Sequence, residues 1–183
     1  DFEHVQLVGV LNADHLLNFP DFRAHERAYQ LLSQVSGRAG RRQKRGLVLI
    51  QSYDPNHRIL QQVSTCDFEG MFFEQKEQRH QFKYPPFYKL IKVTLKHRDF
   101  AVVDKAGFWL TQVLNRGLAP HVLGPVSPSV GRIRNQYLKT LLIKIPQDQS
   151  PSKIKAYMHK ALQRFAAQKE FARVQVVMDV DAL

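Results

Sequence analysis

Apolar positions in the first half of the chain form two short runs with a helical repeat between them. The runs His4 to Val10 and Leu47 to Ile50 predict short buried strands. Between them, small or apolar residues recur every three or four positions, which predicts a helix that ends at Gly37. The positions on this helical face are Ala28, Leu31, Leu32 and Val35. Asp54 to Asn56 predicts a turn after the second strand.

A second, charged helix is predicted from Asp67 to about Gln81, and the motif Tyr84-Pro85-Pro86-Phe87 ends it. Its apolar side carries Phe68, Met71 and Phe72. Neither proline can continue the helical ladder, and the first proline also biases Tyr84 away from helical angles. A domain boundary is therefore predicted near this motif.

Beyond the motif, alternating strands are separated by helices. Ile91, Val93 and Leu95 alternate with polar residues, which is the period of a strand with one face in the core. A helix follows from Asp99, its candidate N-cap, and is predicted to end at Gly117. The remaining elements are a strand at Val122 to Pro125, a strand at Leu141 to Ile145, a helix from Ser150-Pro151, and a strand at Val174 to Val180. This order predicts a split β-α-β sandwich, in which two helices cover one face of an antiparallel sheet.

Composition adds a strong positive charge to this picture. The 183 residues are 44% hydrophobic and carry a formal net charge of +11, with more of the excess in the C-terminal half. Such an excess favours nucleic acid as a partner, although a basic, inert, solvated surface has the same composition. The open face of the predicted sheet would carry Lys92, Lys96 and Lys144 among its outward residues, although lysine is ordinary on any solvent face.

Several classes of protein are disfavoured by the sequence. No run approaches the roughly 18 apolar residues of a membrane helix, and the start Asp1 to His4 does not resemble a secretory signal. We therefore expect a soluble, cytoplasmic protein. The single cysteine, Cys66, cannot form an internal disulfide, and a four-ligand zinc site built on Cys-x-x-Cys pairs is impossible. No metal site is assigned to this chain.

A cationic segment carries the most specific chemical pattern. Arg38 to Arg45 holds five cationic residues and no acid, a composition typical of a solvated loop or a nucleic-acid patch. Two of them, Arg38 and Arg41, lie three positions apart among small residues that let the backbone approach a ligand. Guanidinium binds phosphate oxygens through paired hydrogen bonds. An arginine supplied across a cleft can accelerate phosphoryl transfer by about 10³ to 10⁵.

The octapeptide Gln34 to Arg41, QVSGRAGR, resembles the sixth motif of superfamily 2 helicases. Further matches in family order resemble the primosomal protein N′ (PriA) family of replication restart helicases. They are LVGVLNAD (Leu7 to Asp14), PDFRAHERAYQLLSQVSGRAGR (Pro20 to Arg41), YPPF (Tyr84 to Phe87), GPVSPSVGRIRNQY (Gly124 to Tyr137) and DVDAL (Asp179 to Leu183).

The resemblance implies a fold that combines α/β and α+β parts. Residues 1–65 would be the end of a RecA-like second helicase lobe, with the tail of its fifth motif and its sixth motif. Residues 66–87 would be a helical linker that ends in YPPF. Residues 88–183 would be a C-terminal domain, similar in fold to a ribosomal protein, that binds DNA and partner proteins.

Roles for individual residues also follow from the resemblance. Arg41 is expected to be the arginine finger on the terminal phosphate of ATP, and Arg38 to make a second phosphate or inter-lobe contact. The remaining nucleotide-binding positions are Gln34, Gly37, Gly40 and Asp14. Asp14 superficially resembles a magnesium-binding aspartate, but the family pattern makes it a fifth-motif residue that links the nucleotide and DNA sites.

The parent protein implied by the resemblance is an ATP-dependent 3′-to-5′ DNA helicase of the bacterial cytoplasm and nucleoid. It restarts stalled replication forks and assembles the primosome with other primosome proteins. ATP and magnesium are expected in the parent, and zinc in the parent but not in this chain. The sequence contains no G-x-x-x-x-G-K-[ST] motif and no DExH box, so the chain alone is not expected to be an active ATPase.

A second hypothesis makes this chain a non-catalytic binding module with no membrane partner. Its ligand would be forked or single-stranded DNA, or the acidic tail of a single-strand-binding protein. The candidate contacts are Lys92, Lys96, Arg132, Arg134, Lys144 and Tyr137. A third hypothesis, a ribosome-associated or RNA-binding protein, rests on the basic sandwich alone, and the helicase motif ahead of it disfavours it.

Overall fold

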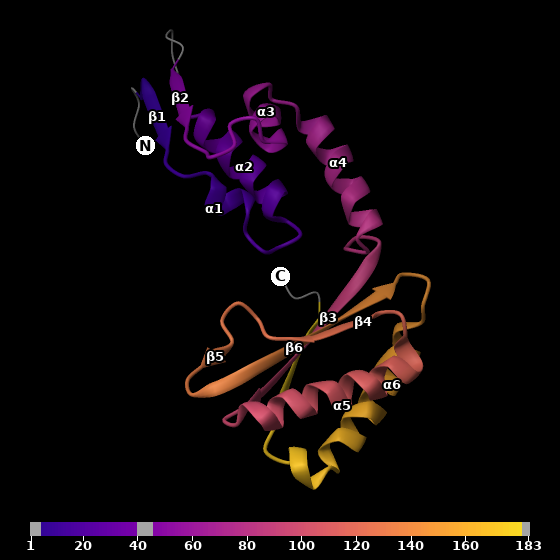
Figure 1. Cartoon of the computed structure of the whole chain (residues 1–183). Helices are drawn as coiled ribbons and strands as arrows, with labels where there is room; N and C mark the ends of the chain where they lie inside the picture. The colour runs from indigo at the N-terminus through magenta and orange to yellow at the C-terminus, as the bar shows by residue number, and fades with distance from the viewer. Residues whose placement is uncertain (1–4, 40–45, 181–183) are drawn as a thin grey trace. The chain divides into compact units, whose positions relative to one another are not determined.

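The computed structural model describes residues 5–39 and 46–180. The chain divides into two compact units, Asp1–Phe82 (unit 1) and Lys83–Leu183 (unit 2), which are described separately (Figure 1). The described residues form six α-helices and two sheets, so the mixed α/β class predicted from the sequence is confirmed. Within the same ranges, no helix is both long enough and apolar enough to cross a membrane.

Unit 1 combines a short parallel sheet with four helices. In chain order its elements are β1 (Leu7–Val10), α1 (Asp14–Leu17), α2 (Ala24–Ser36), β2 (Leu47–Ile50), α3 (Arg58–Ser64) and α4 (Phe68–Gln81). Strands β1 and β2 pair in parallel, from Leu7 beside Leu47 to Val10 beside Ile50. Because the strands are parallel, the loops that follow them leave the sheet at the same edge.

Most elements of unit 1 lie where the sequence predicts them. Helix α4 begins after Asp67, whose carboxylate accepts the Gly70 N–H at 2.8 Å. Of the predicted strand His4 to Val10, the last four residues form β1, and His4 lies outside the described residues. Helix α3 was not predicted. It is only seven residues long, and its N-cap is the ring of His57 rather than a Ser, Thr, Asp or Asn side chain.

The two strands of unit 1 are not buried within the described chain. Leu7 and Leu47 are each 57% exposed, and Leu49 is 55% exposed. The core forms instead where the helices meet. It includes Ala13, Leu17, Ala28, Leu32, Ile59, Val63 and Met71. The prediction of buried strands is therefore wrong for these residues, because an apolar run reveals hydrophobicity and not what covers it.

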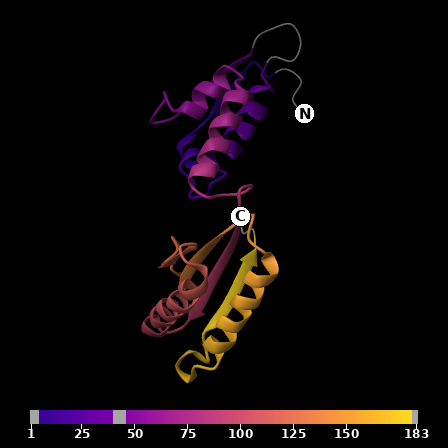
Figure 2. The same cartoon turned by 90° about the vertical axis from the view of Figure 1, so that its right-hand side faces the viewer.

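Unit 2 alternates strands and helices. Its elements are β3 (Tyr88–His97), α5 (Phe100–Leu118), β4 (Val122–Val126), β5 (Arg132–Ile133), β6 (Gln136–Pro146), α6 (Pro151–Ala166), the 3₁₀ turn η1 (Lys169–Phe171) and β7 (Gln175–Val180). The strands lie in the order β4-β6-β3-β7, with β5 paired to β6, and all neighbours are antiparallel. Helices α5 and α6 pack together on one face of this sheet (Figure 2).

The alternation predicted for β3 is confirmed by the core of unit 2. Ile91, Val93 and Leu95 are buried, together with Leu110 of α5 and Ile143 of β6. Helix α5 starts as predicted, since the Asp99 carboxylate accepts the N–H of Ala101 at 2.8 Å. One face of the sheet therefore holds the core, and the opposite face carries the residues that alternate with it.

A glycine inside α5 sets how closely α6 packs. The sequence predicts the end of this helix at Gly117, but α5 continues to Leu118. A Cβ at Gly117 would lie 2.4 Å from the ring of Tyr157 on α6, so a larger residue would displace that ring. The Tyr157 hydroxyl donates to the carbonyl of Val113 at 2.6 Å, which holds the ring in place. The predicted end thus lies one residue before the observed end, and Gly117 serves a tertiary contact that local sequence does not reveal.

Candidate functional site

The residues of the QVSGRAGR segment that the structure describes lie at the C-terminal end of α2. Gln34 is exposed in the last turn, Gly37 is the C-cap, and Arg38 follows it, also exposed. Gly40 and Arg41 lie outside the described residues. Helix α2 therefore presents the first part of the predicted nucleotide-facing segment on the surface of unit 1.

Gly37 is not required by the fold of unit 1. Its φ of −67° is open to any residue, and its N–H donates to the carbonyl of Ser33 at 3.0 Å. A Cβ built on Gly37 would lie 3.5 Å from that carbonyl oxygen, an ordinary van der Waals distance. The chain itself would therefore accept alanine here. A requirement for glycine at this position would have to come from a ligand or a neighbouring domain.

Asp14 lies at the edge of the sheet where the loops after β1 and β2 meet. Its carboxylate accepts hydrogen bonds from the Ser52 hydroxyl at 2.9 Å and from the Tyr53 N–H at 3.1 Å. Desolvation raises the pKa of this carboxyl, but the hydrogen bonds from Ser52 and Tyr53 outweigh it and leave the pKa below its usual value. Asp14 is therefore ionised at neutral pH and ties the two loops together.

A small polar pocket of about 80 Å³ lies beside this carboxylate. Its lining consists of Asn12, Asp14, Gln51, Ser52 and Tyr53. Tyr53 is 94% exposed, so the pocket opens to solvent next to an uncovered aromatic ring. Across the described ranges, no group of three or more His, Cys, Asp or Glu side chains is arranged to hold a metal ion.

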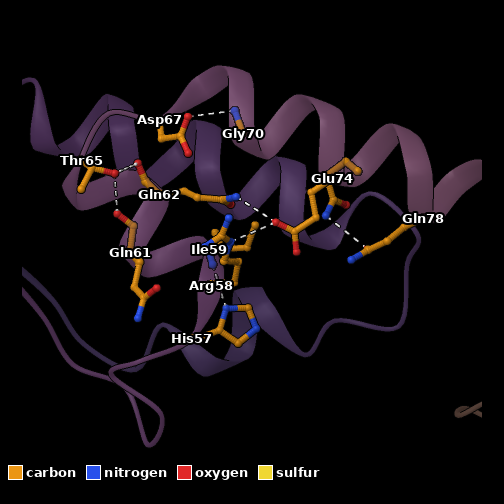
Figure 3. Close-up of polar contacts among 11 residues, drawn as sticks. His57, Arg58, Ile59, Gln61, Gln62, Thr65, Asp67, Gly70, Glu74 and Gln78 are labelled. Carbon is orange, nitrogen blue, oxygen red and sulfur yellow. Dashed lines mark hydrogen bonds and ion pairs between the residues drawn. The ribbon is translucent and has the colours of Figure 1, made fainter.

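Polar contacts join α3 to α4 (Figure 3). Glu74 of α4 accepts hydrogen bonds from Gln62 at 2.9 Å and from Arg58 at 3.3 Å, both on α3. Glu26 of α2 pairs with Arg79 of α4, which joins α2 to the same framework. Helix α2, which carries Gln34 and ends at the C-cap Gly37, is thus held by an ion pair to α4 as well as by the apolar core.

The sequence predicts three lysines on the open face of the unit 2 sheet. The strand register places all three on that face, but their side chains differ in exposure. In the antiparallel pairing of β3 with β6, Lys92 lies beside Leu142, Lys96 beside Leu138, and Lys144 beside Leu90. Lys92 is exposed and Lys96 is partly exposed. These two side chains remain candidates for contact with a polyanion.

Lys144 departs from the sequence prediction, since it is only 8% exposed. Its ammonium lies 3.6 Å from the centroid of the Tyr84 ring, a cation–π contact with the YPPF motif. Burial lowers the pKa of Lys144, and the nearby charge of Lys83 lowers it further. The sequence predicted a solvated Lys144. This prediction is wrong because the segment before β3, which includes Tyr84, covers this end of the sheet.

The remaining candidate contacts belong to the hairpin formed by β5 and β6. Arg132 and Arg134 are exposed, whereas Tyr137 is partly buried against the core. The guanidinium of Arg132 lies 4.9 Å from the centroid of the Tyr137 ring, and the ring of Phe100 meets the same ring edge-on at 5.6 Å. The structure therefore groups these residues at one hairpin. Tyr137 pairs with Arg132 on one side and with His97 on the other, one position from Lys96, whereas Lys92 lies further along the sheet.

An apolar groove between α6 and the edge strand β7 was not anticipated from the sequence. It consists of two adjoining hollows of about 390 and 410 Å³ that share Leu162 and Met178. Lys89, Lys155 and His159 line the first hollow among apolar residues, and no acidic residue lines either hollow. The alternating apolar residues of β7 were visible in the sequence, but its place at the sheet edge was not.

Comparisons with known proteins place the chain among related sequences. A family model described as the primosomal protein N C-terminal domain matches residues 80–183. The replication restart protein PriA of Bacillus subtilis is 37% identical over 185 residues, covering 99% of this chain and 22% of the relative. The PriA proteins of Synechocystis and Haemophilus influenzae are 41% and 34% identical, over 80% and 98% of this chain and 18% and 24% of the relatives. The chain thus spans about a fifth of the length of these relatives.

Proposed function

The chain belongs to the primosomal protein N (PriA) family of replication restart proteins, and from this premise we propose that it is the C-terminal part of an ATP-dependent 3′-to-5′ DNA helicase. Such a helicase would unwind DNA at stalled forks and help to assemble the primosome. The observation that carries the proposal is the family match over residues 80–183, with the QVSGRAGR segment ahead of it on α2. In this proposal, unit 1 is the end of a RecA-like lobe and unit 2 is the ribosomal-protein-like domain.

Within the helicase, Arg41 would stabilise the charge that develops on the terminal phosphate of ATP. Arg38, exposed beyond the C-cap of α2, would bind a second phosphate oxygen or the facing lobe. Magnesium would accompany ATP. Asp14 would hold the loops after β1 and β2 together rather than coordinate magnesium directly. Both of its carboxylate oxygens already accept hydrogen bonds. The chain alone would not hydrolyse ATP.

The residues of this chain do not fit the zinc that the family implies. Structural zinc sites are built from four thiolate or imidazole ligands in a tetrahedral arrangement. The chain has one cysteine, Cys66, and the described residues contain no cluster of metal-ligating side chains. Zinc ligands in the helicase would therefore lie outside this sequence.

Unit 2 would bind DNA through its basic residues, with Lys92 and Lys96 on the open sheet face. Phosphate contacts release counterions, so two contacts alone make the logarithm of affinity fall with a slope of about −1.8 against the logarithm of salt concentration. We expect the affinity of the chain for forked DNA to fall about tenfold or more between about 50 and about 200 mM salt. Fluorescence anisotropy at several salt concentrations measures this slope.

The matched variants for this test differ only in where two positive charges are removed. Lys92→Gln with Lys96→Gln is expected to flatten the salt slope by about 1.8, because both phosphate contacts are lost. Lys160→Gln with Arg164→Gln removes the same charge from the exposed surface of α6 and is expected to leave the slope nearly unchanged. An equal effect of the two pairs would refute the assignment to the sheet face.

A second candidate function is binding of the acidic tail of a single-strand-binding protein, and the groove along α6 and β7 favours it. An acidic peptide with an apolar end matches a groove that is apolar within and carries Lys89, Lys155 and His159. Burying an apolar side chain in such a groove contributes about 1.5 to 3 kcal/mol. This partner is a proposal that rests on the family and on the chemistry of the groove.

Titration of the chain with an acidic peptide that ends in phenylalanine tests this proposal. Lys155→Gln is expected to weaken binding by about fivefold or more, since a charge-assisted contact is worth roughly 1 to 3 kcal/mol. Lys160→Gln, on the same helix but outside the groove lining, is the matched control. Binding that neither variant alters, or no binding of the peptide by the unmodified chain, would rule out this occupant.

A further inference from the structure

The hairpin between β5 and β6 ends in a tight turn with an unusual residue. Arg132 pairs with Tyr137 and Ile133 with Gln136, so Arg134 and Asn135 form a two-residue loop. Both have positive φ, 47° and 61°. Asn is favoured in this left-handed region and Arg is not. The sequence therefore keeps an arginine at the tip where asparagine or glycine would fit the backbone better.

The Arg134 side chain is exposed, and within the described residues it makes no hydrogen bond, ion pair or ring contact. The Arg134 side chain therefore does not offset its unfavourable backbone conformation through a contact within the described residues of unit 2. Strained conformations of this kind are held by the surrounding structure, here the two-residue turn, and they cluster at active sites and ligand-binding sites. Arg134 lies in the turn at the end of the hairpin, beyond the last paired residues of β5 and β6.

Arg132, in contrast, is held in place. Its guanidinium lies over the ring of Tyr137 and donates to the side-chain oxygen of Asn135. The ring of Tyr137 is in turn fixed edge-on by Phe100. The guanidinium is therefore ordered before any ligand arrives, which lowers the entropy lost on binding. Because Arg132 and Phe100 already contact the Tyr137 ring, this tyrosine is poorly placed to stack on a base.

The residue between the two arginines is apolar and uncovered. Ile133 is 51% exposed, and Val130, just before the hairpin, is 61% exposed. In the sequence, this exposed aliphatic residue stands between two arginines, Arg132 and Arg134. Proteins that bend DNA insert such aliphatic wedges between base steps from the minor groove. Arginine is favoured in a narrow minor groove because of its negative potential.

We propose that the β5–β6 hairpin enters the minor groove of duplex DNA beside a fork junction. Ile133 rests against the terminal base pair there, and Arg132 and Arg134 bind the phosphates on either side. This inference rests on the proposed DNA-binding function and specifies the element and the DNA structure. Junction base pairs are already weakly stacked, so a wedge separates them at a lower free-energy cost than in intact duplex. The hairpin would thus recognise fork structure rather than base sequence.

The test uses the 183-residue chain and forked DNA with 2-aminopurine in the last base pair before the fork. Wild-type chain is expected to raise the 2-aminopurine fluorescence, which reports unstacking. Ile133→Ser is expected to abolish most of that rise and to weaken binding by less than about threefold, since phosphate contacts dominate affinity. The same chain is expected to bind linear duplex more weakly than the fork.

Arg134→Asn removes the charge while suiting the positive φ, so it should fold at least as well as wild type. It is expected to weaken fork binding by about three- to tenfold and to flatten the salt slope by about 0.9. Arg164→Asn on α6 removes the same charge from an exposed position away from the hairpin and is expected to change affinity less than about twofold.

The results distinguish failure of the proposed DNA-binding function from failure of the hairpin inference. If wild-type chain binds none of these DNAs, the DNA-binding function of unit 2 fails, and the hairpin inference fails with it. If wild type binds forks but Arg134→Asn behaves like Arg164→Asn, or Ile133→Ser retains the fluorescence rise, the hairpin inference alone is overturned.

Discussion

Replacing Arg41 with alanine in the longer helicase that we propose is expected to lower its DNA-stimulated ATPase rate by about 10³-fold or more. The reason is electrostatic, since a guanidinium directed at the transferring phosphate stabilises charge that exists only in the transition state. The effect should fall mainly on kcat, with a smaller change in KM for ATP. Steady-state ATPase kinetics with saturating forked DNA measure both.

Two further variants make this result interpretable. Arg41→Lys keeps the charge but loses the paired geometry, so it should recover only part of the rate. Lys76→Ala removes an exposed positive charge of unit 1 on α4, outside the polar contacts between the helices, and the rate should be nearly unchanged. An Arg41→Ala protein with wild-type kcat would show that the resemblance to the sixth motif does not extend to its chemistry.

Truncation of Leu110 to alanine is expected to lower the free energy of unfolding of unit 2 by about 2 to 5 kcal/mol. Leu110 is fully buried at the centre of α5, among residues of the sheet and of α6. Its removal loses the transfer free energy of the side chain and leaves a cavity that the packed neighbours fill only in part. Urea denaturation followed by circular dichroism measures the change.

Leu123→Ala is the matched control for this substitution. Leu123 is 49% exposed on β4, so the same truncation should cost less than about 1 kcal/mol. Equal destabilisation by the two substitutions would mean that the core of unit 2 is not organised around α5. A midpoint that shifts with an unchanged denaturant slope would show that the variant still unfolds as a single unit.

Elements set by local chemistry were predictable from the sequence. The start of α4 at Asp67 and of α5 at Asp99 followed from residues that cap a helix with their own carboxylates. The alternation of Ile91, Val93 and Leu95 identified β3, because one face of a strand must meet the core. The short helix α3 escaped prediction, since seven residues carry too little periodic signal.

The candidate sites were likewise predictable from the sequence only in part. Spacing and resemblance predicted that Arg38 and Arg41 face a nucleotide. The structure shows Arg38 exposed just beyond the end of α2, and Arg41 lies outside the described residues, so their role stays a prediction. Arg134 was a candidate contact from the sequence, but its place in the turn of the hairpin was not visible there, because that place depends on a positive φ and on a pairing register. The groove between α6 and β7 required the strand order, which only long-range pairing establishes.

By itself, the sequence determined the class of fold, the positions of most helices and strands, the excess of positive charge and the family motifs. These depend on interactions between residues close together in the chain, or on composition. The tertiary structure alone decided that Tyr84 covers Lys144, that Gly117 makes room for Tyr157 and that β7 has a free apolar edge within the described residues. Each of these depends on which distant surface covers a residue, and a side chain's own chemistry does not specify its neighbour.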